Sequence, residues 1–201
     1  MKYLDDAIVD LPKGDTHVSG SVGDYDLMYG GSASKWLKLA YGLKARYTMR
    51  LMARSSDVAG DMAKVIEYVD KSFASASEQA AYAKYDASNL NPLFDFEWSR
   101  DGISASKSMS EKLIARKDPR ARRVYFDSYY WNHYLPTSAG FNPAPNGAPS
   151  ESQNEYTYSV YVFAQTAPTL LLSYHELLFL KAEALVRLNK VDDAKPVLKE
   201  A

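Results

Sequence analysis

The sequence of 201 residues contains no cysteine, which excludes disulfide bonds, thiolate metal sites and a cysteine nucleophile. It also has no excess charge: 24 basic and 25 acidic side chains give a formal net charge of −1. No bulk field therefore favours nucleic acid or an acidic membrane surface. No run approaches the roughly 18 apolar residues of a membrane span. Met1–Pro12 carries acidic side chains where a signal peptide would be apolar, so this stretch is not predicted to be one.

The composition is otherwise that of a globular protein, with 46% hydrophobic and 24% charged residues. A chain of this length buries roughly 70% of its unfolded surface, which allows a sizeable core. The unusual feature is the aromatic content, with 16 tyrosines against 7 phenylalanines and 3 tryptophans. Tyrosine has an apolar face and a polar tip, so it suits half-exposed recognition surfaces as well as wet cores. Composition alone does not choose between these two uses.

Apolar side chains recur every three or four residues along several segments, which predicts amphipathic helices. The predicted helices cover residues 4–11, 34–54, 57–72, 77–83, 108–117, 173–188 and 192–201. Ser55-Ser56-Asp57 is expected to supply the break before the third helix and its N-cap, and Ser108–Glu111 and Ser173–Glu176 match capping boxes. Pro196 is expected in the first turn of the last helix, where a missing backbone N–H costs little.

Short loops between long helices predict antiparallel pairs. The last pair, from Ser173 to Ala201, has small side chains where a tetratricopeptide-type hairpin brings its helices close together, at Ala184, Ala194 and Ala201. The alternative is two ordinary packed helices. The sequence thus predicts an all-α fold of tetratricopeptide-like hairpins, with both ends of the chain cut from a longer parent protein.

The helical period is lost between Tyr125 and Thr169, where five of the nine prolines fall. A strand is predicted at Tyr156–Phe163, which is rich in Tyr, Thr, Val and Phe. A loop this long inside a compact domain is usually functional or disordered. We therefore expect one domain over residues 1–201, with an irregular Tyr- and Pro-rich excursion at about 125–170.

Three segments, in order along the chain, resemble the SusD/RagB-like family. The first begins Tyr29-Gly-Gly-Ser-Ala-Ser-Lys-Trp36 and continues to Leu51. The second is Ser110–Phe126, which includes Asp118-Pro119-Arg120, and the third is Ser173–Leu188, which includes Lys181-Ala-Glu-Ala184. The similarity therefore extends from about Tyr29 to Leu188.

Members of that family are surface lipoproteins of Bacteroidetes-type bacteria that capture nutrients, mostly glycans, for a TonB-dependent, SusC-like transporter. The resemblance therefore implies an outer-membrane, surface-exposed parent protein that binds glycans without being an enzyme. A lipid anchor would belong to that parent, because this chain has no lipid-acceptor cysteine and is itself expected to be soluble. An alternative is a tetratricopeptide-like protein-interaction scaffold that has no small-molecule ligand.

Aromatic side chains followed by an amide are the best candidates for ligand contact. Rings pack against the C–H faces of sugars, while neighbouring polar groups bond the hydroxyls. The candidate ligand-binding residues are Tyr129, Tyr130, Trp131, Asn132 and Tyr134, with Trp98 as a weaker one. The alternative is that these rings fill the core beneath the long loop.

Catalysis is not expected. Asp95 and Glu97 could act as a glycosidase pair only if both faced one sugar, with one of them desolvated. The three histidines, His17, His133 and His175, lack metal-ligand spacing, and neither a nucleophile elbow nor a phosphate loop is present. No metal and no cofactor are therefore predicted. A row of arginines, Arg46, Arg50 and Arg54, is expected to pair with acids or face water rather than bind nucleic acid.

Overall fold

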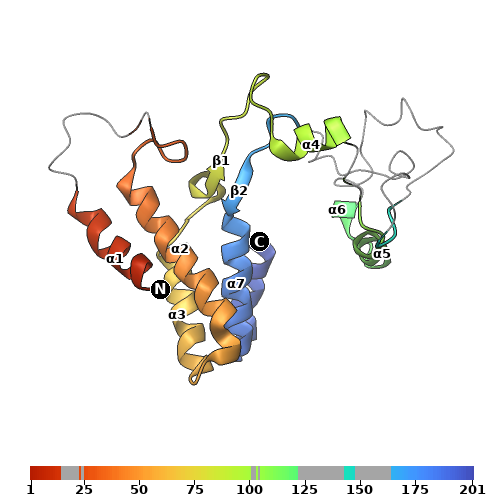
Figure 1. Cartoon of the computed structure of the whole chain (residues 1–201). Helices are drawn as coiled ribbons and strands as arrows, with labels where there is room; N and C mark the ends of the chain where they lie inside the picture. The colour runs from red at the N-terminus through yellow and green to blue at the C-terminus, as the bar shows by residue number, and fades with distance from the viewer. Residues whose placement is uncertain (15–22, 24, 101–102, 104, 122–142, 148–163) are drawn as a thin grey trace. The chain divides into compact units, whose positions relative to one another are not determined.

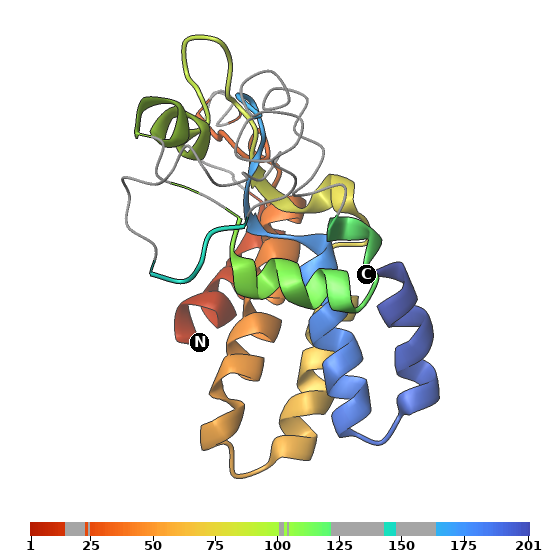
Figure 2. The same cartoon turned by 90° about the vertical axis from the view of Figure 1, so that its right-hand side faces the viewer.

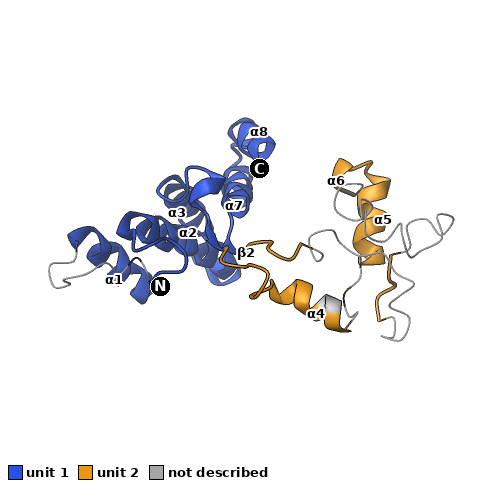
Figure 3. Ribbon diagram, turned by 90° about the horizontal axis from the view of Figure 1, so that it is seen from above, with its two compact units in different colours: residues 1–82, 169–201 blue, residues 83–168 orange. Residues whose placement is uncertain are grey.

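The computed structural model describes residues 1–14, 23, 25–100, 103, 105–121, 143–147 and 164–201. This part of the chain is mainly helical, which confirms the predicted fold class. The chain divides into two compact units. One unit holds Met1–Tyr82 with Thr169–Ala201, and the other holds Ala83–Pro168 (Figure 3). We refer to them as the helical unit and the inserted unit. The predicted single domain stays a prediction.

Two antiparallel hairpins form the helical unit. The first pairs α2 (Ala33–Leu51) with α3 (Val58–Asp70), and the second pairs α7 (Tyr174–Arg187) with α8 (Val191–Glu200). Both hairpins turn at the same end of the unit (Figure 2). Helix α7 packs against α2 and α3, so the hairpins stack as in tetratricopeptide repeats (Figure 1).

One helix in each hairpin starts at a side-chain cap that the sequence indicated. The Asp57 carboxylate accepts a bond from the Gly60 N–H at 2.9 Å and starts α3. The Ser173 hydroxyl accepts a bond from the Glu176 N–H at 3.0 Å and starts α7. The turn between α7 and α8 runs through Asn189, whose positive φ of 57° is a conformation that asparagine tolerates.

The core of the helical unit lies between its hairpins. Met62 and Val65 of α3 are fully buried, as is Leu177 of α7. Ala184 and Ala194 are also buried, and this permits the close approach of α7 and α8 that their positions predicted. The shorter α1 (Lys2–Asp10) packs on α2 and is followed by a 3-10 turn, η1 (Leu11–Lys13). Another 3-10 turn, η3 (Met52–Arg54), follows α2.

Two short strands, which were not predicted from the sequence, carry the chain out of the helical unit and back. Strand β1 (Ala80–Tyr82) pairs antiparallel with β2 (Thr169–Leu172). A helix was predicted at Ser77–Ala83, and this is wrong: only the 3-10 turn η4 (Ala76–Glu78) is helical there. The buried Leu172 side chain explains the strand, because the apolar run before Ser173 places it in the core.

The inserted unit contains three helices among its described residues: α4 (Pro92–Arg100), α5 (Lys107–Ala115) and α6 (Pro119–Ala121). Helix α4 was not predicted. Ser108 was expected to start α5, but Ser106 is the N-cap residue and it makes no side-chain cap bond. The predicted strand at Tyr156–Phe163 lies outside the described residues.

Pro196 departs from its predicted place. Helix α8 starts at Val191, so Pro196 is its sixth residue and lies beyond the first turn. A proline there cannot donate to the Asp192 carbonyl, and its ring crowds the preceding turn. The exposed position of Pro196 on the outer side of α8 limits this cost, because water can reach the freed carbonyl.

Candidate functional site

Most of the predicted ligand-contact residues lie outside the described part of the chain. Tyr129, Tyr130, Trp131, Asn132 and Tyr134 all lie outside the described residues, and their role in binding stays a prediction. His17 and His133 also lie outside the described residues. Trp98 lies in α4, although its side chain is outside the described part. The described contacts near the candidate site belong to the elements that lead into and out of this segment.

Asn91 fixes the start of α4, the helix that carries Trp98. Its side-chain oxygen accepts bonds from the N–H groups of Leu93 at 2.8 Å and Phe94 at 3.3 Å. Its side-chain NH₂ donates to the Ala167 carbonyl at 2.7 Å, and its backbone N–H donates to the Gln165 carbonyl at 2.8 Å. Asn91 is buried, so these bonds are shielded from water. This one residue therefore joins the first part of the inserted unit to its last.

Helix α4 carries Asp95 and Glu97, the two residues considered as a glycosidase pair. Positions 95 and 97 are two residues apart on an α-helix, and residues at that spacing do not face each other. Asp95 is exposed, so it is not desolvated as a general acid must be. The pairing on which a glycosidase reading rested is therefore not supported by this helix.

A metal site finds no support in the described part of the chain, where no group of three or more His, Asp or Glu side chains could hold an ion. His175 is exposed in the first turn of α7, with its ring 5.9 Å from that of Tyr174.

Among the described residues, no helix is long and apolar enough to cross a membrane.

The first family-like segment forms a closed turn before α2. The Asp26 carboxylate accepts bonds from the backbone N–H groups of Met28, Tyr29 and Gly31 and from the Trp36 indole, at 2.8–3.1 Å. Burial raises the pKa of Asp26, but these four donors outweigh it and hold that pKa well below its ordinary value. Gly30 and Gly31 have positive φ angles of 60° and 82°, which explains the paired glycines.

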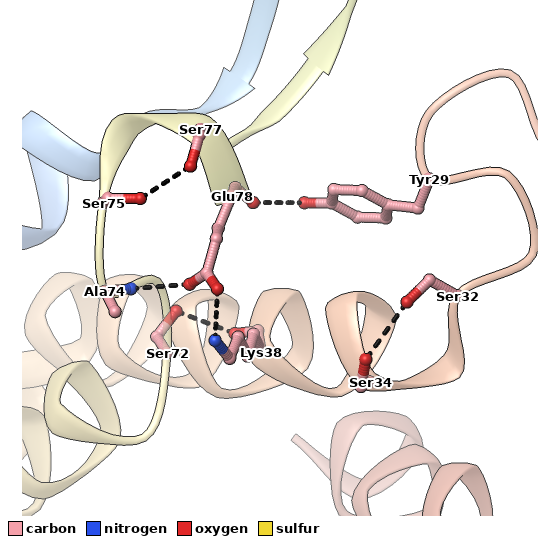
Figure 4. Close-up of polar contacts among 9 residues, drawn as sticks. All are labelled: Tyr29, Ser32, Ser34, Lys38, Ser72, Ala74, Ser75, Ser77 and Glu78. Carbon is pink, nitrogen blue, oxygen red and sulfur yellow. Dashed lines mark hydrogen bonds and ion pairs between the residues drawn. The ribbon is translucent and has the colours of Figure 1, made fainter.

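Tyr29 and Glu78 connect this turn to the segment that leads into β1 (Figure 4). The Tyr29 hydroxyl donates to the Glu78 carbonyl at 3.2 Å. The Glu78 carboxylate accepts bonds from Lys38 at 2.5 Å and from the Ala74 N–H at 2.8 Å. Ser72 donates to the Lys38 carbonyl at 2.7 Å. These groups already bond one another, so the cluster fixes the approach to β1 rather than offering a ligand site.

Burial, together with the nearby negative charges of Asp26 and Glu78, raises the pKa of the Tyr29 phenol to about 12. Tyr29 therefore stays protonated at any physiological pH and remains a hydrogen-bond donor. The Tyr29 ring meets the Trp36 ring edge to face at 5.3 Å. The aromatic pair at the head of α2 is thus part of the scaffold.

The other two family-like segments also have structural contacts. Asp118 accepts bonds from the Arg120 N–H at 2.9 Å and from its guanidinium at 2.6 Å, which lower the pKa of Asp118 to about 2. In the third segment, Lys181 pairs with Asp70 of α3. Arg46 of α2 pairs with Glu176 at the start of α7 and donates to the Leu171 carbonyl of β2. No local pattern indicated the pairing of Arg46 with Glu176, since these two residues are 130 positions apart in the sequence.

Polar contacts within the helical unit fix the strands that flank the inserted unit in the sequence. The bonds of Tyr29, Lys38 and Glu78 hold the entry to β1, and Arg46 holds β2. Between these two strands the chain runs through all of the aromatic residues predicted to contact a ligand. The described contacts thus fix the two strands at which that segment begins and ends.

Comparisons with known proteins agree with the resemblance found in the sequence. A family model described as "Starch-binding associating with outer membrane", SusD-like, matches residues 1–200. A crystal structure of a SusD/RagB family protein from Bacteroides thetaiotaomicron is 49% identical, with a TM-score of 0.86 over 98% of this chain and 42% of its own. No curated protein matches the sequence.

More distant structures share the fold. A SusD homolog from Bacteroides vulgatus is 21% identical, with a TM-score of 0.69 over 98% of this chain and 39% of its own. A chitin-binding protein is 24% identical, with a TM-score of 0.60 over 92% of this chain and 43% of its own. The chain thus spans about two fifths of the length of the proteins it resembles.

Proposed function

Because the chain belongs to the SusD-like family, whose model is described as starch-binding and associating with the outer membrane, we propose that its parent protein binds a nutrient glycan at the bacterial surface. The protein hands that glycan to a TonB-dependent, SusC-like outer-membrane transporter and performs no chemistry on it. The match over residues 1–200 is the observation that carries this proposal, and the 49% identity to a SusD/RagB family protein supports it.

The division of the chain into two units supports the same function. The polar bonds around β1 and β2 hold the ends of residues 83–168 on a well-packed helical base. Aromatic rings in that segment would pack on sugar faces, and Asn132 would bond a hydroxyl. A rigid base lowers the conformational cost of binding, because less of the protein must be ordered when the ligand arrives.

Isothermal titration of the parent protein with soluble starch and a panel of other soluble glycans tests the binding. We expect a saturable heat with at least one glycan, and no release of reducing sugar during prolonged incubation. Absence of binding to every glycan would contradict the proposal. Sugar release that is lost in Asp95→Asn would contradict its non-catalytic part.

A protein-interaction scaffold is the second candidate function, and the stacked hairpins favour it, since repeats of this kind present extended surfaces. Capture of partners from solubilised outer membranes separates the two. Recovery of a large transporter supports delivery of a nutrient, whereas a soluble partner in the absence of any glycan binding supports a scaffold.

A further inference from the structure

The residue at which the chain leaves the helical unit is the strand partner of the residue at which the chain returns to it. Tyr82, the last residue of β1, is the antiparallel partner of Thr169, the first residue of β2. Paired Cα atoms in an antiparallel ladder are only about 5 Å apart. A two-residue hairpin turn spans this gap. Residues 83–168 therefore occupy a place where a tight turn would be sufficient to connect the strands.

The core of the helical unit contains no described residue of the inserted unit. Its buried members are Tyr29, Leu39, Ala45, Met49, Met62, Val65, Val69, Phe73, Ala80, Leu172, Leu177 and Ala184. Among the described residues, the partly buried side chains packed against them also come from the helical unit. Since apolar burial is the main stabilising contribution to a fold, this unit has its own source of stability.

The two hairpins also meet directly, although the inserted unit separates them in the sequence. Helix α7 packs on α3, and Lys181 of α7 pairs with Asp70 of α3. Arg46 joins α2 to Glu176 in the first turn of α7. The interface between the hairpins is thus made by the helices themselves.

We propose that the helical unit is a self-sufficient scaffold and that residues 83–168 are an insertion which it does not need in order to fold. The inserted unit then unfolds independently, and segments of different sequence can be carried on the same pair of strands. This concerns folding and does not depend on the proposed function.

Native-state hydrogen exchange on the whole chain tests the proposal with two matched substitutions. Leu113→Ala removes a buried side chain from the inserted unit, and Met62→Ala removes one from the helical unit. We expect Leu113→Ala to raise amide exchange by about tenfold or more in residues 105–121 and to leave α3 and α7 protected as in the wild type. Met62→Ala should raise exchange in α2, α3 and α7. Equal acceleration of α3 and α7 by Leu113→Ala would overturn the proposal.

An excision variant gives a second, independent readout. Residues 83–168 are replaced by Asn-Gly, which favours the two-residue turn between paired strands. We expect a helical circular dichroism spectrum, dispersed amide resonances and one cooperative thermal transition. A second variant with a longer Gly-Ser linker controls for strain in the turn. A molten or unfolded state in both variants would show that the scaffold needs its insertion.

Discussion

The guanidinium of Arg46 holds the carboxylate of Glu176 through two parallel bonds, Nε to Oε1 at 2.6 Å and Nη2 to Oε2 at 2.5 Å. The same Nη2 donates to the Leu171 carbonyl at 2.8 Å. One side chain of α2 thus fixes both β2 and the start of α7. Glu176 was expected to close a capping box with Ser173, but only the Ser173 half of that box forms.

Arg46→Ala should destabilise the helical unit by about 1–3 kcal/mol, because it leaves Glu176 and the Leu171 carbonyl without their partner. A double-mutant cycle with Glu176→Ala, measured by urea unfolding, should give a coupling free energy of about 1–2 kcal/mol. The control is the exposed pair of Arg187 and Glu183 in α7, for which about 0.5 kcal/mol or less is expected. Equal coupling in the two pairs would contradict the assignment of a special role to Arg46.

The sequence predicted those elements whose cause is local. The α2–α3 and α7–α8 hairpins follow from apolar period, and Asp57 and Ser173 are local caps. The two strands could not be predicted, since β1 and β2 are paired across the whole inserted unit. Helix α4 was not predicted, although its start is local: Asn91 caps the helix that Pro92 begins.

For the candidate site, too, the sequence predicted the residues of interest but not their distant contacts. The family-like segments were identified from their residues, but their contacts are structural, and these depend on distant partners such as Glu78 for Tyr29. Nothing in the local sequence of Arg46 distinguished it from Arg50 or Arg54. The aromatic segment from Tyr129 to Tyr134 is a prediction from composition and resemblance alone.

Asp26→Asn should lower stability at neutral pH and remove part of its dependence on acid. The folded-state pKa of Asp26 lies below the ordinary value of 3.8, so its contribution is fully present above about pH 4 and is lost as the pH falls through the folded pKa. Wild type should therefore lose more stability than Asp26→Asn between pH 5 and about pH 2. Thermal melts across this range measure the difference, with Asp193→Asn, an exposed carboxylate in α8, as the control. Parallel pH profiles for wild type and Asp26→Asn would argue against the turn.

Gly42→Ala should destabilise the protein although alanine favours helices. A Cβ atom at Gly42 would lie 2.6 Å from Leu172 Cδ2 and 2.7 Å from Ser72 Oγ. Leu172 is buried and Ser72 is bonded to Lys38, so neither can move freely, and we expect a loss of about 1–3 kcal/mol. In a Leu172→Ala background part of the clash disappears, so the same substitution should cost less there. Chemical denaturation of the wild type and the three variants of this cycle checks the expectation, and additive effects would contradict it.

Asn91→Ala should loosen the inserted unit while sparing the helical unit. It removes the N-cap of α4 and the bond to Ala167, and it leaves buried groups unpaired, at a cost of about 2–3 kcal/mol. Hydrogen exchange should therefore accelerate in residues 93–96 and 164–167. Asn89→Ala, in the exposed turn just before, is the matched control and should change exchange in these residues little. Unchanged exchange in α4 after Asn91→Ala would rule out the capping role.

The three tryptophans should separate scaffold from ligand site. Trp36→Phe removes the bond to Asp26 and alters the edge-to-face contact with Tyr29, so we expect a lower melting temperature and unchanged glycan affinity. Trp131→Ala should do the opposite: affinity for the bound glycan falls by about tenfold or more, because a stacking face is lost, and the melting temperature stays close to that of wild type. Trp98→Ala should have a smaller effect on affinity than Trp131→Ala. Titration calorimetry and thermal melts on the same samples separate the two outcomes. If Trp131→Ala instead lowers the melting temperature and leaves affinity intact, the aromatic segment is core, and the ligand site must be sought outside this segment.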